Sequence, residues 1–296
     1  MPCAVARDRP MTINKLALTS RIVEFDDRSI HLTECGEGFP VLMLHGGGAG
    51  ASGMSNYSRN VEALAQHFRV LVPDMQGYGR SSKGVDRADP FGDLSSAMLG
   101  LLDALDIPTA HVVGNSLGGA CALRMALDCP ERVTSLVLMG PGGVNTTRSV
   151  PTPGLRLLLN YYKGSGPSKE KLERFIRDYL VYDGSLVPDE VIERRYQDSL
   201  DPEVVASPPL QGPKGIPNFK KYDFTRDSRL QRCETPCLVL WGAEDKVNRP
   251  SGGQALQKRM PNCDLYLFSN TGHWVQWERA VEFNACTIGF LQSHTL

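Results

Sequence analysis

Ser116 lies at the centre of the segment Gly114–Gly118, which reads Gly-Asn-Ser-Leu-Gly. The apolar run His111–Val113 precedes it, and a stretch of small residues follows. A strand that feeds a helix through such a turn holds a serine hydroxyl on a strained nucleophile elbow. Glycines are expected there because a Cβ would block the close approach of strand and helix. The segment predicts a nucleophilic serine, although a glycine-rich turn without catalysis has the same pattern.

A serine nucleophile needs a general base, and the base needs an acid that orients it. The apolar run Leu238–Leu240 leads into a loop with Glu244 and Asp245, and His273 follows the next apolar run. The chain order serine, acid, histidine is that of α/β-hydrolases. We assign His273 as the base because, of the six histidines, it alone has the loop position after a strand that a base needs. Asp245 is the preferred acid because a short carboxylate suits the loop apex, and Glu244 is the alternative.

Acyl-type chemistry also needs hydrogen-bond donors for the developing oxyanion. The segment Leu44–Gly48 reads Leu-His-Gly-Gly-Gly and matches a known oxyanion motif. The backbone N–H of Leu117, directly after the serine, is the expected second donor. The glycine loop lacks the Gly-Lys-Ser/Thr ending of a phosphate-binding loop, which argues against nucleotide binding.

The elements that must position these residues follow from the apolar patterning. Short continuous apolar runs predict strands buried on both faces, as in a parallel sheet. These runs are Val41–Leu44, Val70–Val72, His111–Val113, Leu136–Met139, Leu238–Leu240 and Leu265–Phe268. Ile22–Phe25 and Ser29–Thr33 alternate around a polar turn and predict an antiparallel hairpin. Helical periodicity over Leu94–Leu105, Leu117–Leu127 and Val281–Leu291 completes a mostly parallel, doubly wound α/β sheet.

The pattern of strands is interrupted between Met139 and Leu238. Three amphipathic segments occupy this region, followed by a stretch rich in proline and glycine: Leu155–Tyr162, Lys169–Leu180, Asp189–Leu200 and 207–217. A helical insertion between two strands lies over the carboxyl edge of such a sheet, so it is expected to be a lid. We predict a flexible N-terminal tail (1–17), a core in two parts (18–145 and 231–296) and a helical lid (146–230).

Composition limits the function classes. Hydrophobic residues make up 41%, charged residues 22%, and the net charge is −1, which favours a small-molecule partner over nucleic acid. Neither a signal peptide nor an apolar segment of membrane-spanning length is expected, so we predict a cytoplasmic protein without a membrane partner. The eight cysteines are scattered without metal-ligand spacing, and we expect no metal site.

Together, four groups of motifs resemble the meta-cleavage product hydrolases, which hydrolyse carbon–carbon bonds in bacterial degradation of aromatic compounds and steroids. The resemblance extends from about residue 18 to residue 292 and is carried by His45–Gly53 with Ser55–Asn60, Gly114–Gly119, Leu138–Gly143 and Gly272–Glu278. It implies an α/β-hydrolase fold and hydrolysis of 2-hydroxy-6-oxohexa-2,4-dienoates without a cofactor. The implied products are 2-hydroxypenta-2,4-dienoate and a carboxylic acid. A dimer or larger homo-oligomer is also implied.

The resemblance implies roles for individual residues. His273 would assist tautomerisation of the dienol, and Ser116 would then attack the C6 ketone. The N–H groups of Gly47 and Leu117 would hold the oxyanion. Arg195, in the sequence Glu-Arg-Arg-Tyr, would bind the anionic dienoate's carboxylate, with Arg194 as the alternative. The remaining substrate-binding positions implied are Gly46, Asn56, Asn115 and Trp274.

Two departures and several rivals accompany this interpretation. Ala49 and Met54 replace the family's usual proline and tryptophan, so a looser loop and a differently shaped pocket are expected. A carboxylesterase or lipase of the same fold is the main alternative, but an apolar ester needs no carboxylate clamp. A haloalkane dehalogenase would need a carboxylate nucleophile where Ser116 stands. A protein that only binds ligands would be expected to lose part of the triad or the oxyanion loop.

Overall fold

A single mixed sheet organises the molecule. The computed structural model describes residues 17–145, 150–212 and 219–295. Within these residues eight strands pair in the order β1-β2-β4-β3-β5-β6-β7-β8. The strands are β1 (Thr19–Phe25), β2 (Arg28–Cys35), β3 (Pro40–Leu44), β4 (Arg69–Pro73), β5 (Ala110–Asn115), β6 (Val133–Met139), β7 (Cys237–Gly242) and β8 (Cys263–Phe268). The β1–β2 and β2–β4 pairs are antiparallel and the others parallel, which confirms the predicted hairpin and parallel sheet.

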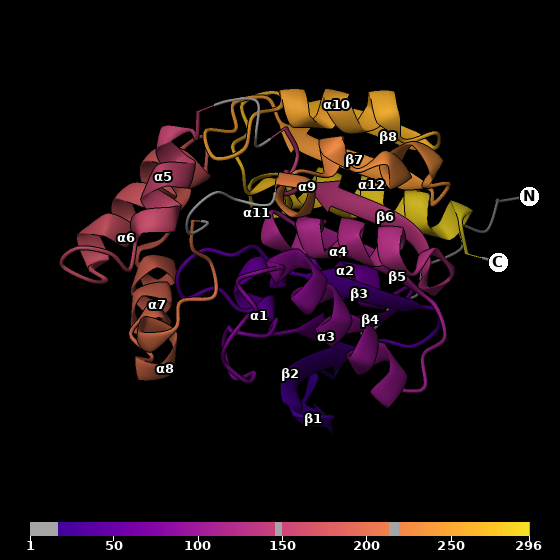
Figure 1. The fold of residues 1–296 in the computed structure, drawn as a ribbon, viewed down its shortest axis with the longest axis horizontal. Helices are drawn as coiled ribbons and strands as arrows, with labels where there is room; N and C mark the ends of the chain where they lie inside the picture. The colour runs from indigo at the N-terminus through magenta and orange to yellow at the C-terminus, as the bar shows by residue number, and fades with distance from the viewer. Residues whose placement is uncertain (1–16, 146–149, 213–218, 296) are drawn as a thin grey trace, which may run out of the picture.

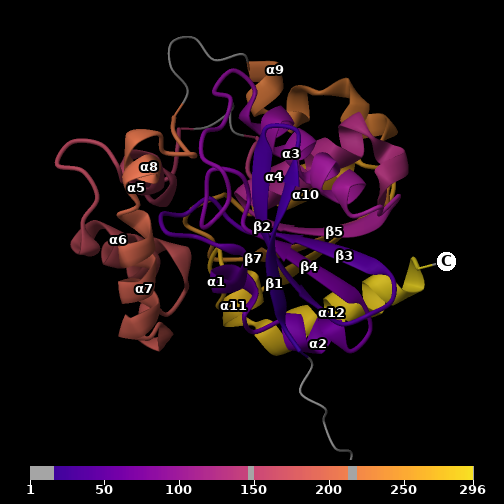
Figure 2. The same cartoon turned by 90° about the horizontal axis from the view of Figure 1, so that it is seen from below.

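Helices cover both faces of this sheet. Figure 2 shows α3, α4 and α10 on one face, with α2, α11 and α12 on the other. The core helices are α1 (Gly53–Tyr57), α2 (Val61–Ala65), α3 (Pro90–Ala104), α4 (Leu117–Asp128), α9 (Phe219–Tyr222), α10 (Ser251–Arg259), α11 (Val275–Glu278) and α12 (Ala280–Ser293). The doubly wound architecture is therefore confirmed. None of the described helices combines the length and the apolar character needed to cross a lipid bilayer.

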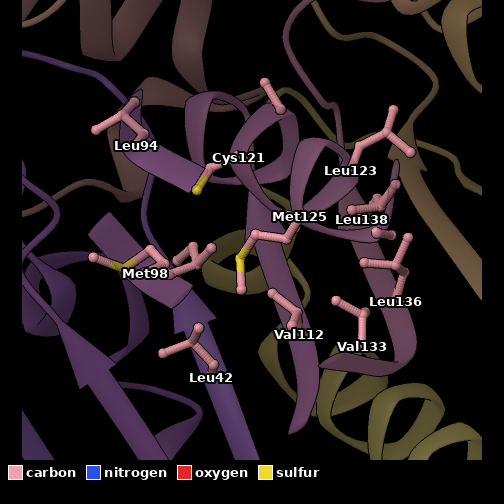
Figure 3. Packing of buried hydrophobic residues seen from close by; sticks show 14 of the residues in the cluster. Leu42, Leu94, Met98, Val112, Cys121, Leu123, Met125, Val133, Leu136 and Leu138 are labelled. Atoms are coloured by element: carbon pink, nitrogen blue, oxygen red, sulfur yellow. The ribbon is translucent and has the colours of Figure 1, made fainter. Parts of the chain in front are cut away.

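Burial of α4 against the sheet fixes the element that follows Ser116. Cys121 and Met125 of α4 belong to the same buried apolar cluster as Val112 of β5 and Leu138 of β6 (Figure 3). All four side chains are fully buried. Removing a buried apolar side chain of this kind costs about 2–5 kcal/mol, so the helix that begins at the elbow is held firmly.

The last strand differs from the prediction. Leu265–Phe268 was expected to be buried on both faces, but Tyr266 is 52% and Leu267 41% exposed. The reason is that β8 ends the sheet order, where it has one neighbouring strand and incomplete helical cover. An apolar run alone does not distinguish a central strand from an edge strand.

The segment between β6 and β7 contains the expected lid helices. They are α5 (Pro153–Asn160), α6 (Lys169–Phe175), α7 (Asp189–Ser199) and α8 (Pro202–Ala206), and Figure 1 shows them grouped to one side of the sheet. Their apolar side chains form a separate cluster that also includes Ala49, Val247 and Trp274 from core loops. The lid therefore packs directly onto the loops at the carboxyl edge of the sheet.

Two details of the lid differ from the sequence interpretation. The helix expected over Lys169–Leu180 ends at Phe175 and continues as a π turn over Ile176–Leu180. Phe224 and Leu230 fall in the segment expected to be lid but pack in the main core. Except for Ala17, the predicted tail lies outside the described residues. Residues 213–217 of the proline- and glycine-rich stretch also lie outside them.

Candidate active site

Ser116 occupies the turn between β5 and α4 in a strained conformation. Its φ is +53° and its ψ is −110°, a region that non-glycine residues rarely adopt. Its N–H donates to the carbonyl of Met139, at 2.8 Å. A Cβ on Gly118 would lie 2.2 Å from the carbonyl oxygen of Leu44, and one on Gly114 would lie 2.5 Å from that of Gly118. The flanking glycines are thus required by close backbone approach, as the sequence predicted.

Asp245 and His273 meet at the ends of β7 and β8. His273 Nδ1 lies 2.7 Å from Asp245 Oδ2, and both side chains are buried. The same carboxylate accepts N–H groups from Trp241 Nε1, Val247 and Asn248 at 2.8–2.9 Å. An acceptor-only carboxylate places the proton of the imidazole on Nδ1, which leaves the lone pair on Nε2. His273 Nε2 is buried and has no hydrogen-bond partner among the described residues.

The other acid of this loop has a different place. Glu244 Oε2 accepts the backbone N–H of Thr271 at 3.0 Å. Glu244 therefore contacts the main chain two residues before His273, whereas Asp245 contacts the imidazole itself.

His45 anchors the glycine loop from within the core. Its Nε2 accepts the N–H of Met75 at 2.9 Å, so its proton lies on Nδ1, which donates to the carbonyl of Gly46 at 2.9 Å. Burial lowers the pKa of His45, which keeps the ring neutral at physiological pH. In a trans peptide the C=O and the next N–H point in opposite directions, so this bond also orients the N–H of Gly47.

The two expected oxyanion donors, Leu117 and Gly47, come from different elements and lie next to each other. Leu117 is the first residue of α4, so its N–H has no partner within the helix. Gly47 lies against Leu117, because a Cβ on Gly47 would lie 2.9 Å from Leu117 Cδ2. Gly46, an expected substrate-binding position, lines the cavity beside Ser116. Its N–H is already paired with Asn56 Oδ1 at 3.3 Å, and its carbonyl with His45.

Arg195 projects from α7 into the same pocket. Its side chain is buried, with 3% of the residue exposed, whereas Arg194 is exposed. Nε and Nη2 donate to the carbonyl of Ala49 at 3.2 and 3.0 Å. Within the described residues it pairs with neither aspartate nor glutamate, and desolvation lowers its pKa to about 10. The guanidinium is still charged at neutral pH and has N–H groups left for an anion.

The pocket joins these groups in one cavity. Its lining consists of Gly46–Gly48, Asn56, Asn115, Ser116, Leu158, Phe175, Leu180, Arg195, His273 and Trp274, and it contains about 290 Å³ of space between atoms. Asn115 Nδ2 donates to the carbonyls of Met139 and His273, at 3.2 and 3.4 Å. The ring of Trp274 lies 5.7 Å from the Arg195 guanidinium. Every predicted catalytic or substrate-binding side chain except Asp245, which lies behind His273, lines this cavity.

Sequence reasoning missed two residues that hold the site together. One is His45, whose ring is an anchor for the oxyanion loop as described above. The other is Tyr78, whose buried hydroxyl donates to the carbonyl of Gly47 at 3.2 Å. The only local signal for Tyr78 is its position in the loop after β4, at the same edge of the sheet.

The described residues contain no group of three or more His, Cys, Asp or Glu side chains placed to hold a metal ion. The arrangement instead combines a serine at a helix start, an oriented imidazole, two peptide N–H groups and a buried cation. Such a set can perform nucleophilic attack on a carbonyl carbon of an anionic molecule.

Comparison with known proteins agrees with this geometry. Residues 40–280 match the family model of the α/β-hydrolase fold. The chain is 37% identical over 290 residues to a 2-hydroxy-6-oxo-6-phenylhexa-2,4-dienoate hydrolase of Burkholderia cepacia, covering 95% of this chain and 99% of the relative. It is 38% identical over 273 residues to a 2-hydroxy-6-oxononadienedioate/2-hydroxy-6-oxononatrienedioate hydrolase of Pseudomonas sp, covering 89% and 92%. The solved structure of a meta-cleavage product hydrolase from Pseudomonas fluorescens IP01 superposes with a TM-score of 0.82 at 30% identity, covering 93% and 98%.

Proposed function

This chain belongs to the meta-cleavage product hydrolases of the α/β-hydrolase fold, and we propose that it hydrolyses the C5–C6 bond of 2-hydroxy-6-oxohexa-2,4-dienoates. In this proposal Ser116 is the nucleophile, His273 the base and Asp245 the acid that orients it. The N–H groups of Gly47 and Leu117 form the oxyanion hole. The products are 2-hydroxypenta-2,4-dienoate and a carboxylic acid.

One observation carries the proposal: a buried arginine that has no acidic partner among the described residues lines the cavity of Ser116. Burying a charge is expensive unless it is paired, so an unpaired guanidinium favours an anionic ligand at this position. A dienoate brings a carboxylate next to an oxygen on C2, which suits the planar fork of Arg195. Asn56, Asn115 and Trp274 line the same cavity and are proposed to hold the polar end of the substrate.

The reaction requires a proton transfer before the carbon–carbon bond breaks. His273 assists transfer of the 2-hydroxyl proton to C5, which gives the keto form. Ser116 then attacks C6 while the oxyanion hole takes the negative charge. The C5–C6 electron pair leaves on C5 as an enolate conjugated with the C2 ketone, and a proton restores the hydroxydienoate. Water releases the second product as a carboxylic acid, so one water is consumed in each turnover.

A carboxylesterase of the same fold is the second candidate, because the serine, histidine and oxyanion groups serve it equally well. Arg195 distinguishes the two functions, because an uncharged ester offers nothing to pair with a buried guanidinium. We also propose that the protein is a cytoplasmic homo-oligomer and that it needs neither a metal nor a cofactor.

The test is disappearance of the dienolate absorption on addition of the purified, metal-free protein at neutral pH. We expect turnover of 6-aryl or 6-alkyl dienoates and little hydrolysis of an uncharged chromogenic ester. Ser116→Ala should bind the dienoate, seen as a shift of its spectrum, without turning it over. Faster hydrolysis of the ester than of every dienoate would replace this proposal with the esterase, and wild-type turnover by Ser116→Ala would refute the assignment of the nucleophile.

A further inference from the structure

The carboxylate of Glu278, at the end of α11, accepts three backbone N–H groups. Oε2 accepts the N–H of Tyr182 at 2.7 Å, and Oε1 that of Trp274 at 3.3 Å. The N–H of Gly272 is shared between the two oxygens, at 3.0 and 3.1 Å. Gly272 and Trp274 are the residues on either side of His273. The carboxylate thus holds both flanks of the histidine by their main chain.

The third N–H comes from the lid. Tyr182 follows the π turn Ile176–Leu180, and the N–H of His273 donates to the carbonyl of Leu180 at 2.8 Å. A Cβ on Gly272 would lie 2.7–2.9 Å from the backbone of Leu180–Tyr182. The histidine loop and the lid are therefore in direct main-chain contact, and Glu278 bridges the two from one side.

Only an acceptor fits at this position. All the groups that contact the carboxylate are N–H donors, so a neutral amide would turn its own NH₂ toward at least one of them. Among the described residues Glu278 pairs with neither lysine nor arginine, and the adjacent Arg279 pairs with Glu282. The charge of Glu278 is thus compensated by peptide dipoles on the two segments that it joins. Charge-assisted bonds of this kind are about twice as strong as neutral ones.

We propose that Glu278 is a positioning residue that couples docking of the lid to placement of the catalytic histidine. The inference rests on the proposed role of His273. The lid that Glu278 holds through Tyr182 also carries Arg195 on α7. One carboxylate therefore sets two distances together: the one between the imidazole and the serine, and the one between the carboxylate clamp and the serine.

The core side of the coupling is tested with Glu278→Gln, and Glu244→Gln is the matched control. Glu244 also accepts a backbone N–H of the histidine loop, that of Thr271, and this contact does not involve the lid. We expect Glu278→Gln to lower kcat/KM for a dienoate by about tenfold to a hundredfold, with both a lower kcat and a higher KM, because small misplacements of reacting groups have effects of that size. Glu244→Gln should stay within about twofold of wild type, because it leaves both docking contacts intact.

The lid side is tested by removing the N–H of Tyr182. Val181 has φ −114° and ψ 162°, a conformation that a following proline accepts. Tyr182→Pro removes the donor, while Tyr182→Ala removes only a side chain that is 47% exposed. We expect Tyr182→Pro to impair kcat/KM and Tyr182→Ala to leave it near wild type. Because Glu278→Gln and Tyr182→Pro break one shared contact, their effects should be less than additive in the double variant.

Hydrogen exchange of the Gly272, Trp274 and Tyr182 amides, together with the thermal midpoint, separates positioning from general loss of structure. We expect faster exchange at these amides in Glu278→Gln, with the exchange of β5 amides unchanged. Wild-type kinetics of Glu278→Gln, equal losses in Glu244→Gln, or fully additive effects would overturn the coupling. Failure of the proposed function has a different signature: the wild type would not turn over any dienoate. Failure of the proposed role of His273 would leave His273→Ala active on the dienoate, whatever Glu278→Gln does.

Discussion

The guanidinium of Arg195 donates two hydrogen bonds to the main-chain carbonyl of Ala49. This contact ties the buried cation of the lid to the loop that contains Gly47, so the proposed carboxylate clamp and the proposed oxyanion donor are linked through this loop. Because Arg195 binds the carbonyl, the contact does not depend on the side chain at position 49. The same contact is therefore available with alanine here as with the family's usual proline.

Arg195→Ala is expected to weaken substrate binding. Bonds to a charged group contribute about 1.5–3 kcal/mol, so KM for a dienoate should rise about tenfold to a hundredfold. Arg194→Ala is the matched control, since Arg194 is adjacent on α7 but exposed, and its KM should be near wild type. Steady-state kinetics on the same dienoate decide between them. A larger effect of Arg194→Ala would move the clamp one residue earlier.

His45→Phe is expected to loosen the oxyanion loop. The substitution leaves the Gly46 carbonyl and the Met75 N–H unpaired in the core, and each such group costs about 1–3 kcal/mol of stability. We expect a lower free energy of unfolding in urea. We also expect a lower kcat, with a reduction no larger than the roughly hundredfold to thousandfold decrease that follows loss of an oxyanion donor. His67→Ala, at an exposed histidine, is the control. An unchanged kcat for a folded His45→Phe would contradict the role of this ring in orienting Gly47.

Gly140→Ala is expected to disturb the proposed catalytic pair, His273 and Asp245, directly. Gly140 has φ +47°, and its Cβ would lie 2.9 Å from His273 Nδ1 and 3.1 Å from Asp245 Oδ2. Gly164→Ala is the control, with φ +67° and open space around the Cβ among the described residues. Both variants should lose about 1–2 kcal/mol of stability from the left-handed backbone. Only Gly140→Ala should also lower kcat, and equal kcat values for the two variants would argue against the clash.

The stability of the protein is expected to fall at mildly acidic pH because of His111. Burial lowers the pKa of His111 to about 4, and its ring nitrogens contact Ser135 and Thr295. An unfolded histidine has a pKa of about 6.5, so between pH 6.5 and 4 the unfolded chain binds a proton that the folded chain does not. The free energy of unfolding therefore decreases as the pH falls through this window.

The contribution of His111 is measured by denaturant unfolding at pH 7 and pH 4.5 in wild type and in His111→Gln. We expect wild type to lose about 2–3 kcal/mol more than the variant over this interval, from the difference between the two pKa values. The same loss in both proteins would assign the acid sensitivity to other groups.

The sequence by itself determined the central sheet and the residues that we propose to react. Glycine spacing around Ser116 and the apolar runs of β3 to β7 are local patterns, because a tight turn and a doubly buried strand each restrict the residues along one short segment. The order of serine, acid and histidine along the chain is likewise a property of the sequence alone. For the same reason β8 was misjudged, since an apolar run does not record whether a strand has one neighbour or two.

Only the tertiary structure decided how these residues act on one another. It placed Asp245, and not Glu244, against His273, and it buried Arg195, and not Arg194, against the loop of Ala49. Each placement depends on which side chain faces a loop far away in the sequence. It also showed that His45, Tyr78 and Glu278 form hydrogen bonds with main-chain groups. Such contacts leave no pattern of side chains in the sequence. Contacts made through a carbonyl or an N–H can be formed by any residue type, and so they become visible only when the chain is folded.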